Sequence, residues 1–346
     1  MTSDQTSRRS ADVEGKARRG YSARFLFQVR AAEIARSACR DTNLRWGGSN
    51  PVCLAAVCSR RLNARPPKKT LKSIAARRQE FRELHQSGCF VLPNPWDIGS
   101  AKYLESLGFK ALATTSAGFA FSRGLPDGAV GRDLMLAHIE EIVNATDLPV
   151  NADFENGYGH EPEEVGGNVQ LCVETGVAGI SVEDNRGDQT LYEVEAAVER
   201  IRAAKESIAG SGAMLIGRAE CFLVGRDDIS EVIRRLTAYA EAGADCLYAP
   251  GIREREHIRA VVAAVAPKPV NLLISAPGGL TINDAAELGV RRVSVGGALA
   301  RAAWGGFANA AKELAEQGTF GGFADATPHG ALQTLFKRAP KNRPTS

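Results

Sequence analysis

The sequence predicts an α/β fold, a (β/α)8 TIM barrel followed by a C-terminal helical extension. From about residue 90 onward, short β-branched apolar runs alternate with helix-period segments, and several of these segments end in glycine, as helix C-termini commonly do. Strands that alternate with helices form parallel sheets, and eight such units point to a closed barrel. An open doubly wound sheet is the alternative, but no GxGxxG pattern follows the first strand.

The predicted elements follow one another in a regular order. The strands are expected at residues 89–93, 111–116, 149–154, 179–184, 213–220, 246–250, 269–275 and 291–297. The helices are expected at residues 98–108, 132–145, 163–176, 191–206, 228–243, 255–266 and 282–289, with a longer one at 301–318 and a small one within 320–337. The last two make up the helical extension.

Charge divides the 346-residue chain into a basic leader and an acidic body. Residues 1–70 carry 15 lysines and arginines against 5 acids, whereas residues 71–346 carry 28 against 35. We therefore expect a disordered leader over 1–70, a catalytic barrel with its C-terminal helices over 71–337, and a flexible tail over 338–346. The acidic body argues against nucleic acid as a partner.

The cysteines and the hydropathy pattern bear on location. The seven cysteines are odd in number, scattered and without CxxC spacing, which predicts reduced thiols and a cytoplasmic protein. Organelle targeting by the arginine-rich and serine-rich leader is the alternative. No apolar run approaches the roughly 18 residues of a membrane span, so no membrane partner is expected.

Charged residues gather where the middle strands of the predicted barrel end. The third strand ends in Asp153 and Glu155, the fourth in Glu183 and the fifth in Arg218. In such barrels the chemistry takes place at the carboxyl ends of the strands, so these side chains should converge. Three hard oxygen ligands, Asp153, Glu155 and Glu183, suit Mg²⁺, and no pair of histidines has the spacing of a zinc or iron site.

A 2-oxo acid is the ligand that we expect such a site to bind. A bound Mg²⁺ would polarise its ketone and stabilise an enolate. Arg218 could grip a carboxylate or the developing oxyanion, although an ion pair with Glu220 or Glu183 is the structural alternative. Ser116, Ala117 and Gly118 offer a hydroxyl and backbone amides to a second carboxylate. His138 and His160 are interpreted as surface or capping histidines.

Five ordered segments resemble the phosphoenolpyruvate mutase and isocitrate lyase superfamily over about two-thirds of the chain. They are NPWDIGSAKYLESLGFKAL, TTSAGFAFSRGLPD, ADFENGYG, ISVED and GRAE. The resemblance implies that Asp153, Glu155 and Glu183 bind Mg²⁺ directly or through water, and that Asp127 lies beside the metal. It also implies that residues 116–118 and Arg218 bind the 2-oxo acid, and that the chain forms a homo-oligomer, a dimer or a tetramer.

Two segments differ from the motifs of that family, and they limit the reactions that we expect. The family's carbon-carbon lyases carry a lysine-cysteine-glycine-histidine loop after the strand-four acid, whereas this chain has EDNRGDQTLYEVE there, and GRAE replaces the usual arginine-threonine-aspartate. We therefore expect a Mg²⁺-dependent lyase or mutase for an oxaloacetate-like or phosphonopyruvate-like substrate. The alternatives are a phosphate-binding barrel isomerase or synthase, suggested by APGGL and VGGAL, and a non-catalytic scaffold that binds a metabolite.

Overall fold

The computed structural model describes residues 71–338. The expected leader and most of the expected tail lie outside these residues. Within them, eight parallel strands form one sheet in the order β1-β8-β7-β6-β5-β4-β3-β2. The strands are β1 Phe90–Leu92, β2 Leu112–Ala113, β3 Val150–Asp153, β4 Gly179–Glu183, β5 Met214–Arg218, β6 Cys246–Tyr248, β7 Val270–Leu273 and β8 Arg292–Ser294. The barrel prediction is confirmed, with each strand at or within its predicted run.

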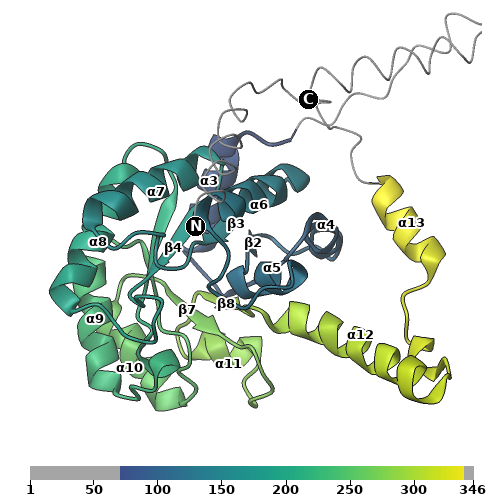
Figure 1. Ribbon diagram of the computed structural model, residues 1–346. Helices are drawn as coiled ribbons and strands as arrows, with labels where there is room; N and C mark the ends of the chain where they lie inside the picture. Colours follow the sequence, from purple (N-terminus) through teal and green to yellow (C-terminus); the bar gives the residue numbers. More distant parts are fainter. Residues whose placement is uncertain (1–70, 339–346) are drawn as a thin grey trace, which may run out of the picture. The chain divides into compact units, whose positions relative to one another are not determined.

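The helices connect and cover the strands (Figure 1). They are α3 Ile74–Leu84, α4 Ile98–Ser106, α5 Ser116–Ser122, α6 Arg132–Ala145, α7 Pro162–Glu174, α8 Val194–Ser207, α9 Ile229–Glu241, α10 Arg255–Val265, α11 Ile282–Glu287, α12 Ala298–Gln317 and α13 His329–Arg338, with short 3-10 turns η1 Cys221–Val224 and η2 Gly321–Phe323. Two of them, α3 and α5, were not expected from the sequence. No helix of residues 71–338 is long and apolar enough to cross a membrane.

The ring of strands is nearly closed. The edge strands β1 and β2 share no ladder, but the Ala113 amide donates to the carbonyl of Pro93 at 3.1 Å, just past the end of β1. β2 is short because Ser116, expected at the end of a strand, instead begins α5. The Thr115 side chain caps this helix by accepting a hydrogen bond from the Gly118 amide.

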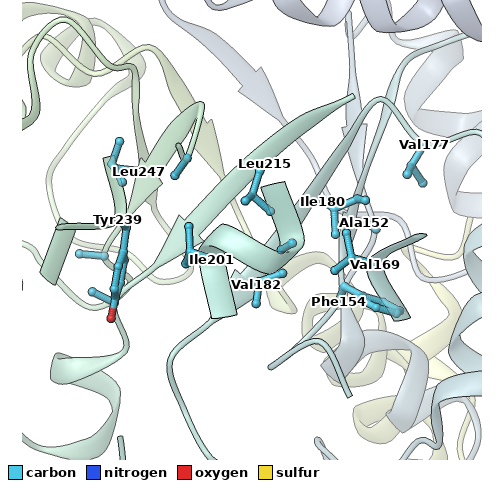
Figure 2. Close-up of a cluster of buried hydrophobic side chains, with 14 of the residues drawn as sticks. Ala152, Phe154, Val169, Val177, Ile180, Val182, Ile201, Leu215, Tyr239 and Leu247 are labelled. Atoms are coloured by element: carbon cyan, nitrogen blue, oxygen red, sulfur yellow. The ribbon is translucent and has the colours of Figure 1, made fainter. Parts of the chain in front are cut away.

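The core has two layers, because successive residues of a strand face opposite sides. Outward-facing residues of β3 to β6 pack against α7, α8 and α9. Figure 2 shows Ala152 beside Val169, Val182 and Leu215 around Ile201, and Leu247 beside Tyr239. Inward-facing residues form a separate cluster that fills the barrel. The barrel is therefore a packed core, and only its carboxyl-terminal end is available for chemistry.

Helix α3 packs at the amino-terminal end of the barrel. Its Phe81 is fully buried against Gly179, the first residue of β4, where a side chain would collide with the phenyl ring. Arg78 donates to the carbonyl oxygens of Val173, Val177 and Ser211, which lie before β4 and β5. These bonds satisfy backbone groups that would otherwise be left without partners at this end.

Candidate active site

Strand alternation aims three charged side chains into the open end of the barrel. Asp153 shares a face with Asn151, Glu183 with Ser181 and Arg218 with Ile216, and the latter residues are buried inside the barrel. The register pairs Glu183 directly with Arg218, and Asp153 with Ser181. The structure therefore brings the acids and the guanidinium together, as the sequence predicted.

The Arg218 guanidinium forms an ion pair through each of its nitrogens. Nη1 donates to Asp153 Oδ1 at 2.6 Å, Nε to Glu220 Oε1 at 2.9 Å, and Nη2 lies 3.4 Å from Glu183 Oε2. The ring of Tyr248 adds a cation-π contact at 4.8 Å. Burial lowers the pKa of Arg218, but the three carboxylates outweigh this effect and raise it, so the guanidinium stays charged. The ion-pair alternative considered for Arg218 is thus observed.

Burial, and after it the crowding of carboxyl groups, raises the pKa of several acids. Burial is the main cause for Glu183 and Glu220; Glu220 raises the pKa of Glu183 further, and Arg218 opposes the rise in both. Burial and the charge of Asp153 raise the pKa of Asp127. For Glu155, burial with Asp153 and Asp127 raises the pKa to about 7, although Tyr158 donates to Oε1 at 3.0 Å. Five carboxyl groups thus surround one guanidinium, so the site has an excess of negative charge.

Of the three residues predicted to bind substrate at the second strand, only Ser116 faces the site. Its amide and hydroxyl donate to Asp153 Oδ2 at 2.9 and 3.1 Å, and its hydroxyl lies 3.3 Å from Asp127 Oδ1. Ala117 does not line the cavity, and Gly118 is buried against Thr115, Trp96 and Ala300, where a side chain would collide. The Gly118 amide is also used by the helix cap. These two positions therefore serve the packing of α5, and substrate contact through them stays a prediction.

The loop after β3 is held in an unusual conformation. Glu155 and Tyr158 have positive φ values of 45° and 54°, which residues with a side chain rarely adopt. The buried Arg200 of α8 fixes this loop by donating to the carbonyl oxygens of Asn156, Gly159 and His160. The strain is consistent with a functional loop whose shape is imposed by its surroundings.

A cavity of about 1170 Å³ opens above these residues. Predicted site residues in its wall are Ser116, Asp127, Glu155, Glu183 and Arg218. Asp153 lies directly behind Ser116 and Arg218, and is hydrogen-bonded to both. The loops after β3 and β4 complete the wall, so six of the eight predicted site residues are gathered at one opening.

The donor set fits Mg²⁺ in its chemistry. Among residues 71–338, no group of three or more His, Cys, Asp or Glu side chains is spaced to hold a metal ion, and Arg218 and Ser116 both bind Asp153. Mg²⁺, however, is usually held by one or two carboxylates and several waters. The excess of carboxylates around Arg218 marks a place where a divalent cation would relieve repulsion. Asp153, Glu155 and Glu183 are the residues that would hold it.

The glycine loops that suggested phosphate binding are engaged elsewhere. The amides of Val295 and Gly296 both donate to Asn94 Oδ1, at 3.0 and 2.9 Å. Gly278 lines a separate, smaller cavity of about 110 Å³. Neither loop lies in the wall of the large cavity, so the geometry favours the carboxylate site over the phosphate alternative.

Sequence reasoning missed a buried network behind the site. Asp184 faces outward from β4, and its carboxylate accepts from Tyr239 at 2.6 Å, Arg235 at 3.0 Å and the Glu220 amide at 2.8 Å. The network holds the chain just beyond Arg218. The interpretation of His138 as a surface or capping residue was wrong, because its ring is buried and stacks on Phe119 at 3.7 Å. His160, by contrast, lines the cavity.

Comparisons with known proteins agree with this site and fold. Residues 81–315 match the phosphoenolpyruvate phosphomutase family. A solved structure from Burkholderia cenocepacia J2315, provisionally described as a lyase/mutase, is 47% identical with a TM-score of 0.74, over 76% of this chain and 97% of that one. An oxaloacetate acetylhydrolase solved with its product oxalate is 28% identical, with a TM-score of 0.69 over 77% of this chain and 94% of that one.

A curated relative extends the comparison to a second activity. The oxaloacetate decarboxylase of Paraburkholderia xenovorans is 29% identical over 246 residues, 67% of this chain and 79% of that protein. The family match spans more than half of the chain and includes every strand from β1 to β8. The chain therefore belongs to the phosphoenolpyruvate phosphomutase family, a family of lyases and mutases.

Proposed function

We propose that the protein is a Mg²⁺-dependent lyase that acts on a small, oxaloacetate-like 2-oxo acid through an enolate. One observation carries the proposal: Glu183 and Arg218 face a cavity large enough for substrate and water at the open end of the barrel, and Asp153 is ion-paired to Arg218 behind its wall. The relatives that act on oxaloacetate support the substrate class.

Decarboxylation is the reaction that the residues suit best. As the bond between C3 and C4 of oxaloacetate breaks, its electron pair forms the C2-C3 double bond, the ketone oxygen gains negative charge, and CO2 leaves. When bound, Mg²⁺ would supply positive charge to that oxygen. Arg218 keeps Asp153 and Glu183 in place, and each of its two terminal nitrogens retains a hydrogen beyond its ion pair for an oxygen of the substrate.

The cysteines support this choice over carbon-carbon cleavage with a cysteine acid. Among residues 71–338, Cys89, Cys172, Cys221 and Cys246 all lie outside the cavity wall, and burial raises the pKa of each thiol. Decarboxylation releases CO2 without protonating a leaving group, and the enolate can take its proton at C3 from water. A site without a thiol acid can therefore complete this reaction.

The test is a screen of oxaloacetate, phosphonopyruvate, phosphoenolpyruvate and 2-methylisocitrate with Mg²⁺ and with EDTA. We expect turnover of oxaloacetate that EDTA abolishes and that Asp153→Asn lowers by at least about a hundredfold. If neither EDTA nor Asp153→Asn affects turnover, the proposed site is wrong. Binding of oxalate without turnover of any of the four compounds would favour the metabolite-binding scaffold instead.

A homo-oligomer, dimer or tetramer, is proposed as the working state. Helix α12 and the segment after it expose large apolar side chains, among them Trp304, Phe307 and Leu314 on α12 and Phe320 and Phe323 beyond it. Apolar faces of this kind on a water-exposed helix mark interaction surfaces. A second copy of the chain is the partner that the family resemblance suggests.

A further inference from the structure

The cavity wall contains three arginines, and their surroundings differ. Arg218 is committed to the ion pairs described above. Arg132 is paired with Asp133 at 2.7 Å and donates to Asn168 at 2.8 Å. Within residues 71–338, no carboxylate lies within ion-pair distance of the third, Arg186. The wall thus keeps one guanidinium whose charge is not neutralised by a direct partner.

A short, internally braced loop presents Arg186 to the cavity. Asn185 bridges to Leu191, and the Arg186 amide donates to the carbonyl of Thr190 at 2.9 Å. The guanidinium lies 4.9 Å from the ring centre of Tyr192, a buried residue whose hydroxyl is 2.6 Å from His160 Nδ1. A cation-π contact holds the side chain without cancelling its charge, unlike an ion pair. The loop that departs from the family's lysine-cysteine-glycine-histidine pattern therefore supplies a positive group.

The charge distribution in the cavity gives this arginine a role. The acids near the strand ends suit a cation and the ketone end of a substrate, but they would repel a second anionic group on the same molecule. A dianionic substrate therefore needs positive charge elsewhere in the wall. Guanidinium groups bind carboxylates and phosphonates in two-point fashion, which makes Arg186 suitable for either.

We propose that Arg186 binds the distal anionic group of the substrate, so that the enzyme selects 2-oxo acids with a second carboxylate or a phosphonate over monocarboxylates. The inference rests on the proposed function, because it assumes that the 2-oxo acid end lies at Asp153 and Arg218. Arg186 would then set substrate choice without taking part in bond cleavage.

The test measures binding by calorimetry in the presence of Mg²⁺. The probes are pyruvate, a 2-oxo acid with no distal anionic group, 3,3-difluorooxaloacetate, which has a distal carboxylate, and phosphonopyruvate, which has a distal phosphonate. The variants are Arg186→Gln and Arg186→Lys. Arg226→Gln is the matched control, because Arg226 is exposed on the neighbouring loop after β5, lies outside the cavity wall and has no ion pair within residues 71–338.

Arg186→Gln should weaken binding of at least one distal-anion probe by about tenfold or more, with pyruvate changed less than twofold. Arg186→Lys should restore part of the loss, and Arg226→Gln should bind all three probes as the unchanged protein does. The probe that loses affinity identifies the distal group as carboxylate or phosphonate. Each variant's thermal unfolding checks that it is folded.

Two results would overturn the proposal while leaving the proposed function intact. The first is that the distal-anion probes bind the unchanged protein no better than pyruvate, and the second is that their affinity survives Arg186→Gln. A different result would remove both. If none of the three probes binds the unchanged protein with Mg²⁺, the site does not accept 2-oxo acids, and the role of Arg186 falls with it.

Discussion

Replacing Glu155 by glutamine should stabilise the metal-free protein at alkaline pH. The Glu155 carboxyl has a pKa of about 7, against an ordinary value of 4.5, chiefly because it is buried and then because Asp153 and Asp127 lie near it. A carboxyl whose pKa is raised by folding binds more protons in the folded state. Stability is therefore lost as pH rises from about 4.5 to about 7, and the full cost is present above that range.

The size of the effect follows from the rise of the Glu155 pKa from 4.5 to about 7. This rise corresponds to about 3 kcal/mol of unfolding free energy at pH 8, and the partial exposure of Glu155 to water reduces it to roughly 1–3 kcal/mol. Glutamine is neutral and of similar shape, and its amide oxygen can still accept from Tyr158. Glu155→Gln should thus raise the free energy of unfolding by that amount at pH 8, and by less than about 1 kcal/mol at pH 5.

Thermal unfolding with EDTA at pH 8 and pH 5 measures this gain. In a domain of this size it corresponds to a rise in Tm of about 2–6 °C at pH 8. Added Mg²⁺ should stabilise the unchanged protein at pH 8 but have little effect on Glu155→Gln, because the variant lacks one of the proposed ligands. A variant that unfolds at or below the temperature of the unchanged protein in EDTA at pH 8 would refute the electrostatic reasoning, as would an equal gain at both pH values.

Three further outcomes test other parts of the molecule. Tyr239→Phe removes a donor to the buried Asp184 carboxylate and should lower the free energy of unfolding by about 1–3 kcal/mol in urea, whereas an unchanged midpoint would contradict the network. Phe307→Asp should shift the protein to a smaller assembly in light scattering, with unfolding unaffected, if the exposed face of α12 joins copies of the chain. Gly157→Ala should reduce oxaloacetate turnover at least about tenfold with the barrel still folded, because φ is 77° and the new Cβ would lie 2.9 Å from Val165; normal turnover would show that the loop tolerates displacement.

The barrel was predictable because each strand carries its own local signal. Runs such as 179–184 and 213–220 consist mostly of apolar residues and lie between two helix-period segments, and these signals do not depend on distant contacts. Helix α5 was missed for a tertiary reason. It starts at Ser116, shortly after β2, and its seven residues are too few to show a helical pattern in the sequence. The cap at Thr115 and the close packing of Gly118 on Ala300 stabilise it.

The sequence was enough to predict which residues form the site, but not which of them form ion pairs with one another. The rule that chemistry lies at the carboxyl ends of the strands was enough to select Asp153, Glu183 and Arg218. Whether Arg218 faces substrate or acids depends on distances across three strands, which spacing in the sequence does not encode. The same holds for Asp184, whose partners Arg235 and Tyr239 come from α9, about 50 residues away.

The ion pairs of Arg218 bear on how such a site can be both stable and reactive. A buried guanidinium that binds three carboxylates offsets much of the cost of their burial, so removing it would leave several uncompensated charges. Its positive charge is nevertheless smaller than the negative charge around it, and the pKa values of Glu155 and Asp127 are raised, chiefly by burial and then by the neighbouring carboxylates. A divalent cation would relieve that imbalance, so the repulsion among the acids favours binding of the ion that the proposed reaction needs.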